Sequence, residues 1–255
     1  MSARSVDLPL PDGPSTATNS PGAMERSMRS TIVSCRPPDG SRRVRARSWI
    51  RGVSIVVVYL TVTLLASAAP REPLVIFLGD SLTAGYGLPA DASFPALAAE
   101  MSDKKGAPFN FVNAGVSGDT TSGGLDRTDW LLGQKPDLFV IGLGVNDALR
   151  GQPVDRIEAN LRSIVTRAKA AGARVLLLGM RVPTNFGPDY ADAFAAIYPR
   201  VAKSEKVTLM PFLLDGVGGH PQLNLDDGIH PNREGQRIVA TNVLVFVERA
   251  LKAKP

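Results

Sequence analysis

The chain has 255 residues, of which 44% are hydrophobic and 21% are charged. This composition is too rich in apolar residues for a chain that is disordered over its whole length. The net charge of +5 comes from the first 68 residues, with nine arginines and four acidic residues; the other 187 hold 20 basic and 20 acidic residues, too even a balance for a nucleic-acid partner. The single cysteine, Cys35, lies in that basic part, and only His220 and His230 follow, so we expect no disulfide, thiol nucleophile or metal site in the rest.

The N-terminal 68 residues divide into two predicted segments. Residues 1–43 contain six prolines and eight serines without apolar periodicity, which indicates an unstructured leader or a translated stretch upstream of the true start. Residues 44–68 combine a basic run with an uncharged apolar stretch and end in Ala66-Ser67-Ala68, the order of a secretory signal peptide. We expect cleavage after Ala68 and export to the periplasm or the medium; an uncleaved membrane anchor is the alternative.

The remaining segment, residues 69–255, alternates short apolar runs with longer amphipathic ones. Continuous apolar runs predict strands that are covered on both faces, as in a parallel sheet. The five predicted strands are residues 74–78, 109–113, 138–143, 174–179 and 207–210. Helical spacing predicts helices over residues 154–171, 189–204 and 233–253. This alternation predicts one three-layer α/β/α domain with a five-stranded parallel sheet.

Polar residues gather directly after the predicted strands, where ligands bind in such folds. Asp80-Ser81 follows the first strand, and Asn146-Asp147 follows the third. Each of these is alone compatible with a turn or a helix cap, and we assign Asp80 to holding the turn. Near the C-terminus, the spacing Asp227-Gly-Ile-His230 lets the carboxylate return to one imidazole nitrogen, leaving the other for the Ser81 hydroxyl. His220 has no such partner and is assigned to structure or to the rim of the cleft.

The ordered blocks Gly79-Asp80-Ser81-Leu82, residues 113–120, residues 144–147 and residues 226–232 together resemble the SGNH, or GDSL, family of serine hydrolases. Within it, residues 74–251 are most similar to the bacterial arylesterases, acyl-CoA thioesterases and lysophospholipases. The resemblance implies the flavodoxin-like fold of that family and hydrolysis of carboxylic esters and thioesters through an acyl-enzyme, without cofactor or metal. It implies a small-molecule substrate with an acyl chain.

The family's functional positions fall on these residues of the chain. Ser81 matches the nucleophile, and Asp227 and His230 match the other triad members. Gly115 and Asn146 match the backbone and side-chain donors of the oxyanion hole, with the Ser81 N–H as the third. By the same resemblance residues 148–153 and 182–190 flank the acyl chain, with plain surface loops as the alternative. Their apolar residues Leu149, Val182, Pro183 and Phe186 are the candidates for lining an acyl pocket, and a core position is the alternative for Phe186.

Two other functions stay open at this point. The same triad suits a sugar O-acetyl esterase or an acyltransferase, and a catalytically silent lipid- or glycan-binding domain is the alternative from another class. We expect a monomer, with no nucleic-acid partner and no stable membrane insertion once the signal peptide is removed.

Overall fold

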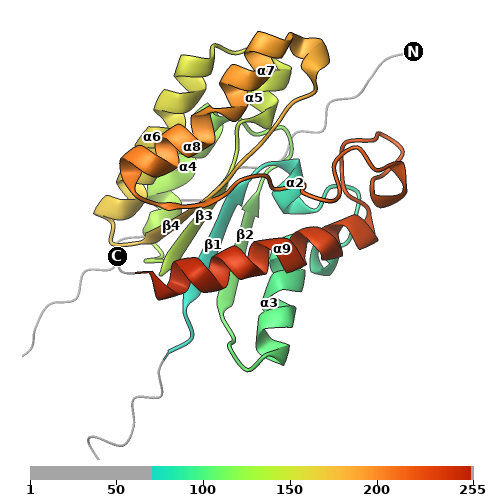
Figure 1. The fold of residues 1–255 in the computed structure, drawn as a ribbon. Coiled ribbons are helices and arrows are strands. Elements are labelled where there is room, and N and C mark those ends of the chain that lie inside the picture. The colour runs from blue at the N-terminus through green and yellow to red at the C-terminus, as the bar shows by residue number, and fades with distance from the viewer. Residues whose placement is uncertain (1–70, 254–255) are drawn as a thin grey trace, which may run out of the picture. The chain divides into compact units, whose positions relative to one another are not determined.

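The computed structural model describes residues 71–253, which form a three-layer α/β/α arrangement (Figure 1). The predicted signal peptide and leader therefore lie outside the described residues. In the part that the structure describes, no helix is long and apolar enough to cross a membrane.

Five strands and eleven helical segments make up this part of the chain. The strands are β1 (Leu74–Gly79), β2 (Asn110–Gly115), β3 (Leu138–Gly142), β4 (Arg174–Leu178) and β5 (Thr208–Met210). The α-helices are α2 (Ser81–Ala84), α3 (Phe94–Lys104), α4 (Thr121–Leu132), α5 (Val145–Leu149), α6 (Val154–Ala170), α7 (Pro188–Ala195), α8 (Ile197–Glu205) and α9 (Arg233–Lys252). Short 3-10 turns are η1 (Ala90–Ala92), η2 (Thr184–Phe186) and η3 (Pro221–Leu223).

The sheet is parallel throughout and has the strand order β2-β1-β3-β4-β5, which confirms the predicted fold class. The chain runs outward from β1 to β2 and then crosses to β3 on the other side of β1. The last residues of β1, β2 and β3 lie side by side in the sheet, because Gly79 pairs with Gly115 on one side and with Gly142 on the other. The loops that leave these strands therefore start at one edge of the sheet, at the point where the strand order reverses.

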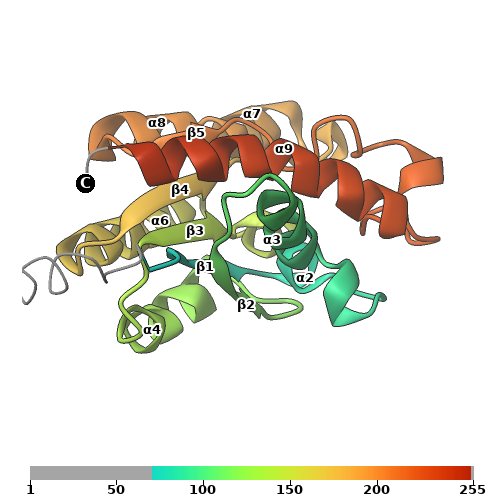
Figure 2. The same ribbon diagram turned by 90° about the horizontal axis from the view of Figure 1, so that it is seen from below.

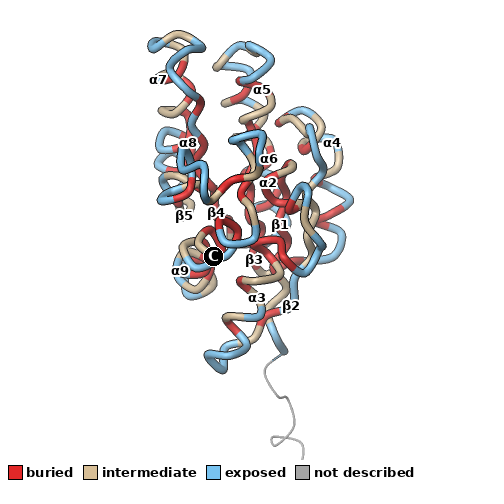
Figure 3. The backbone as a smooth tube through the Cα atoms, turned by 90° about the vertical axis from the view of Figure 1, so that its right-hand side faces the viewer, coloured by how far each residue is buried: buried red, intermediate tan, exposed pale blue. Residues whose placement is uncertain are grey.

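Helices cover both faces of the sheet, α3 and α9 on one and α4, α6 and α8 on the other (Figure 2). As Figure 3 shows, the buried residues concentrate in the sheet and on the inner sides of these helices. Strands β1, β3 and β4 are buried almost throughout, as their apolar runs predict, whereas β2 is an edge strand whose first two residues are exposed.

One predicted helix, residues 189–204, is wrong as a single element. The structure has two helices there, α7 and α8, separated at Ala196. Pro199 explains the break, since it has no N–H to donate to the carbonyl of Ala195 and its ring crowds that carbonyl. The helix predicted over residues 154–171 is found as α6, and the one over residues 233–253 is found as α9.

Helix α9 is joined to the N-terminal half of the domain by a buried side chain. Gln236 accepts a hydrogen bond from the Phe94 N–H at 2.8 Å and donates to the Leu82 carbonyl at 3.4 Å. Its side chain thus ties α9 to the turn around α2 and to the start of α3.

Candidate active site

Ser81 opens helix α2, directly after the buried strand β1. Asp80 caps this helix, its side chain accepting a hydrogen bond from the Leu82 N–H at 3.0 Å, which is the structural role expected for it. The strand packs close to the helix because residue 79 is glycine: a Cβ there would lie 2.0 Å from the Thr83 hydroxyl. This tight turn holds the Ser81 hydroxyl at the carboxyl edge of the sheet.

The Ser81 hydroxyl is in contact with a carboxylate–imidazole pair from the loop before α9. His230 Nε2 lies 2.8 Å from Ser81 Oγ, and His230 Nδ1 lies 2.7 Å from Asp227 Oδ2. Since the carboxylate can only accept, the proton of a neutral His230 resides on Nδ1 and leaves Nε2 as the acceptor for the hydroxyl. The structure therefore joins the three side chains in the order Asp227, His230, Ser81.

The loop that carries this pair is held by its own hydrogen bonds. Asp227 Oδ1 accepts from the N–H groups of His230 at 2.9 Å and Ile229 at 2.8 Å, while the Leu225 N–H donates to the His230 carbonyl at 2.7 Å. The N–H groups of His230 and Ile229, with the imidazole after them, lower the pKa of the Asp227 carboxyl to about 2. Asp227 is therefore ionised wherever an imidazole titrates. The Tyr86 ring lies against the imidazole, 4.5 Å between centroids.

Asn146 lies on the short helix α5, which follows β3. Its amide nitrogen donates to the Asp119 carbonyl at 2.9 Å and lies 3.4 Å from Asp80 Oδ2. The helix starts after Gly144, which must be glycine because its φ is +120° and because a Cβ there would lie 2.5 Å from the Tyr198 hydroxyl. The Asn146 side chain lines the same pocket as Ser81 and His230.

The geometry at Gly115 does not favour its expected role as an oxyanion donor. Gly115 is the last residue of β2, its N–H donates to Asn113 Oδ1 at 3.0 Å, and it does not line the pocket. Glycine is needed there for packing, since a Cβ would lie 2.3 Å from the Ala84 nitrogen in α2. Gly118, three residues later, does line the pocket, and within residues 71–253 its N–H donates no hydrogen bond.

Two buried carboxyl groups lie behind the site. Burial is the main reason that the pKa of the Asp80 carboxyl is raised to about 7. The hydrogen bond from the Leu82 N–H lowers this pKa, whereas the nearby carboxylates of Asp119 and Asp147 raise it. Both carboxylate oxygens of Asp147 accept hydrogen bonds from Thr121, one from its N–H at 2.8 Å and one from its hydroxyl at 2.7 Å. The hydrogen bonds of both carboxyl groups thus serve the turns around the site.

A pocket of about 710 Å³ opens beside Ser81 and His230. The predicted acyl-chain residues Leu149, Val182, Pro183 and Phe186 all line it. Apolar residues that were not predicted from the sequence line it as well: Leu82, Tyr86, Val145, Phe212, Leu214 and Ile229. Arg181 also lines the pocket, with its guanidinium 4.9 Å from the centre of the Phe212 ring. His220 is exposed and does not line it. Such a volume and lining suit an elongated apolar group.

Within the described part of the chain, no cluster of three or more His, Cys, Asp or Glu side chains could hold a metal ion. The groups at the site are a nucleophile, a base with its orienting carboxylate, and amide donors, which together can carry out acyl transfer.

Comparisons with known proteins agree with this chemistry. Residues 77–238 match the model of the GDSL-like lipase/acylhydrolase family. The chain is 41% identical over 192 residues to an arylesterase of Vibrio mimicus, with 75% of this chain and 94% of the relative covered. It is 44% identical over 183 residues to thioesterase 1/protease 1/lysophospholipase L1 of Escherichia coli, covering 71% and 86%. Among solved structures, TesA superposes with a TM-score of 0.67 at 42% identity, covering 69% of this chain and 99% of that one.

Proposed function

Because the chain belongs to the GDSL-like lipase/acylhydrolase family and is a hydrolase of esters and thioesters, we propose that it works through an acyl-enzyme on Ser81. The observation that carries this proposal is the continuous chain of hydrogen bonds Asp227–His230–Ser81, 2.7 Å and 2.8 Å long. A serine hydroxyl is a weak nucleophile unless a neighbouring base takes its proton, and this arrangement supplies that base.

In the acylation step, Ser81 Oγ attacks the carbonyl carbon of the substrate and its proton passes to His230 Nε2. Asp227 orients the imidazole and stabilises the positive charge that forms on it. When the tetrahedral intermediate collapses, His230 returns the proton to the oxygen of the departing alcohol or the sulfur of the departing thiol. Water then attacks the acyl-enzyme in the same way, with His230 again taking the proton, and the product is a carboxylic acid.

The negative oxygen of the tetrahedral intermediate needs hydrogen-bond donors that are in place beforehand. We assign this role to the N–H groups of Ser81 and Gly118 and to the Asn146 amide, with Gly118 replacing Gly115. Two facts support the replacement. Gly118 lines the pocket and Gly115 does not, and the Gly118 N–H donates no hydrogen bond within the described residues, whereas the Gly115 N–H donates to Asn113.

The acyl part of the substrate is proposed to lie in the apolar pocket, between Leu149 on one side and Val182, Pro183 and Phe186 on the other. The names of the relatives, an arylesterase and a thioesterase/lysophospholipase, support a broad range of leaving groups. All the proposed groups come from one chain, which supports activity as a monomer.

The division of the chain is also a proposal. Residues 1–43 would be a leader, residues 44–68 a signal peptide removed after Ala68, and residues 69–255 the hydrolase domain, located in the periplasm or outside the cell. The basic run before an uncharged apolar stretch supports this order. N-terminal sequencing of the protein from the producing cell tests it: Ala69 is the expected first residue.

The catalytic proposal is tested by comparing the protein with its Ser81→Ala variant on p-nitrophenyl esters from acetyl to palmitoyl. We expect turnover to vanish in the variant, and a fluorophosphonate to label the wild type alone. Ser122→Ala, at an exposed serine of α4, is the matched control and should keep full activity. Equal turnover in Ser81→Ala would refute the acyl-enzyme, and a preference for acetyl would replace the fatty-acyl pocket with the acetyl-ester alternative.

A further inference from the structure

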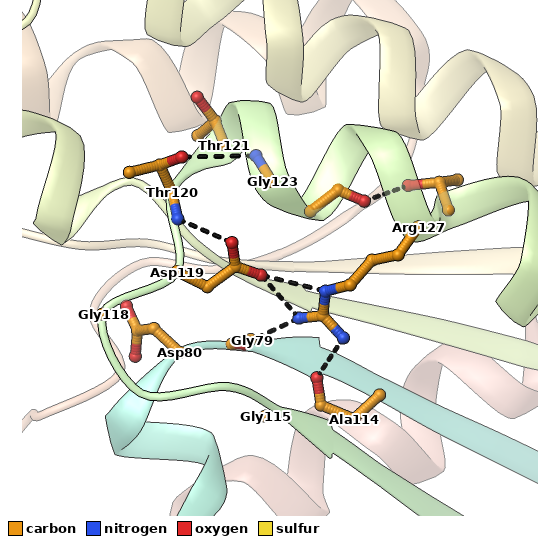
Figure 4. Close-up of polar contacts among 12 residues, drawn as sticks. Gly79, Asp80, Ala114, Gly115, Gly118, Asp119, Thr120, Thr121, Gly123 and Arg127 are labelled. Atoms are coloured by element: carbon orange, nitrogen blue, oxygen red, sulfur yellow. Dashed lines mark hydrogen bonds and ion pairs between the residues drawn. The ribbon is translucent and has the colours of Figure 1, made fainter. Parts of the chain in front are cut away.

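The guanidinium of Arg127, on α4, is held by a set of contacts that no part of the proposed chemistry uses (Figure 4). Nη1 donates to the Ala114 carbonyl at 2.6 Å and Nη2 to the Gly79 carbonyl at 3.0 Å. Nε donates to Asp119 Oδ2 at 2.9 Å, and Nη2 lies 2.8 Å from the same oxygen. The two charged side chains are only 23% and 10% exposed, unlike the exposed ion pairs elsewhere on the domain. Such a multiply bonded, largely buried guanidinium fixes the groups around it geometrically.

The three groups that Arg127 binds each precede or hold one proposed oxyanion donor. The Gly79 carbonyl ends β1, two residues before Ser81. The Ala114 carbonyl lies near the end of β2, from which the loop to Gly118 departs. Asp119 follows Gly118, and its backbone carbonyl accepts the hydrogen bond from the Asn146 amide at 2.9 Å. One side chain therefore connects the segments that carry all three donors.

Asp119 is itself fixed, so this connection is rigid. Its Oδ1 accepts from the Thr120 N–H at 2.9 Å, beside the start of α4. The space around that oxygen is full: a Cβ on residue 123 would lie 2.1 Å from Oδ1, which only glycine avoids. Gly123 thus allows the carboxylate to reach both the helix start and the guanidinium.

We propose that Arg127, acting through Asp119, is a positioning residue that sets the spacing of the oxyanion donors at Ser81, Gly118 and Asn146. The proposal rests on the function proposed above. It predicts that loss of Arg127 weakens binding of the tetrahedral transition state and leaves binding of the ground state unchanged. A residue that only stabilised the fold would not separate these two.

The test uses Arg127→Gln and Arg127→Lys, with Arg200→Gln as the matched control, because Arg200 makes an exposed two-pronged contact with Glu158 on the far helices. For each protein we would measure kcat and KM on a p-nitrophenyl ester. We would also measure inhibition by a trifluoromethyl ketone, which forms an oxyanion on the serine, and by the fatty alcohol of equal length, which does not. Thermal unfolding is recorded so that assays run on folded protein.

For Arg127→Gln we expect kcat to fall roughly 10- to 100-fold, the scale of a small misplacement of catalytic groups, and ketone affinity to fall by a similar factor. KM and affinity for the alcohol should stay within about twofold of the wild type, a change too small to matter on that scale. Arg127→Lys should lie between the wild type and Arg127→Gln, because an ammonium cannot reach all three acceptors at once. Unchanged kcat, or equal weakening of ketone and alcohol, would overturn the proposal.

Gly123→Ala keeps the proposal testable if Arg127→Gln fails to fold. Alanine favours a helix, so the variant should keep α4 while its methyl group displaces the Asp119 carboxylate. It should show the same separation of ketone from alcohol, and wild-type behaviour would count against the role of Asp119. Asn146→Ala distinguishes failure of this proposal from failure of the proposed oxyanion hole. If Asn146→Ala keeps full activity, the proposed oxyanion hole is wrong. If Asn146→Ala loses activity and Arg127→Gln does not, only the positioning role of Arg127 is rejected.

Discussion

Replacing Asp227 in two ways should separate its orienting role from simple loss of a charge. In Asp227→Asn the amide oxygen can still accept from the N–H groups of Ile229 and His230, so the NH₂ faces His230 Nδ1. Nδ1 must then be the acceptor, and the ring proton moves to Nε2, which faces Ser81 Oγ and can no longer take its proton. We expect kcat to fall about 10⁴-fold, as for a triad locked in the wrong tautomer.

Asp227→Ala should be the less damaged of the two variants. The Asp227 side chain is 36% exposed, so water can take its place and accept the Nδ1 proton. No group then forces the proton onto Nε2, so we expect a smaller loss of kcat than in Asp227→Asn, with partial recovery when formate is added.

The assay is kcat on a saturating p-nitrophenyl ester, normalised to active sites, with Asp226→Asn as control because Asp226 is a neighbouring exposed carboxylate. An asparagine variant more active than the alanine variant would refute the tautomer argument, and formate rescue of the asparagine variant would do so as well.

Two further predictions concern groups near the nucleophile. Asn146→Ala should lower kcat by about 10²–10³ with little change in KM, since one oxyanion donor is lost, and steady-state kinetics showing less than a tenfold loss would contradict the assignment. Asp80→Asn should change how stability depends on pH: burial raises the pKa of Asp80 from 3.8 to about 7, so the folded state binds the proton more tightly and stability falls as pH rises from about 4 to 7. Urea unfolding at several pH values should show that fall in the wild type and a flatter profile in the variant, and identical profiles would refute it.

Much of the fold could be predicted because its signals are local. Buried parallel strands read as apolar runs, and the chemistry collects where they end. The separation of α7 from α8 also had a local signal, Pro199, which helical spacing alone conceals.

The choice between Gly115 and Gly118 as oxyanion donor depends on a feature that is not local. Two glycines, Gly115 and Gly118, follow one another closely, and a match to a pattern does not say which N–H faces the pocket. Gly115 still belongs to β2, where its N–H is taken by Asn113, while Gly118 lies in the loop with φ +79°. The residue at which β2 ends decides between them, and the ends of strands are the least certain part of a prediction from sequence.

Two further pocket residues could have been predicted from the rule that ligands bind at the carboxyl ends of parallel strands. Phe212 and Leu214 closely follow β5, whose carboxyl end lies at the same edge of the sheet as that of β1. The Arg127 contacts, in contrast, had no signal in the sequence, because they join groups on three segments that only the assembled sheet brings together.

The buried Gln236 bond between α9 and the α2 turn has a consequence for when activity can appear. Ser81 is made early during synthesis, but its base is 149 residues later and is placed only once α9 has docked on the N-terminal half. A chain in which α9 has not yet docked therefore lacks the base that activates Ser81. During refolding, the return of esterase activity should coincide with the last cooperative step rather than with the first appearance of secondary structure.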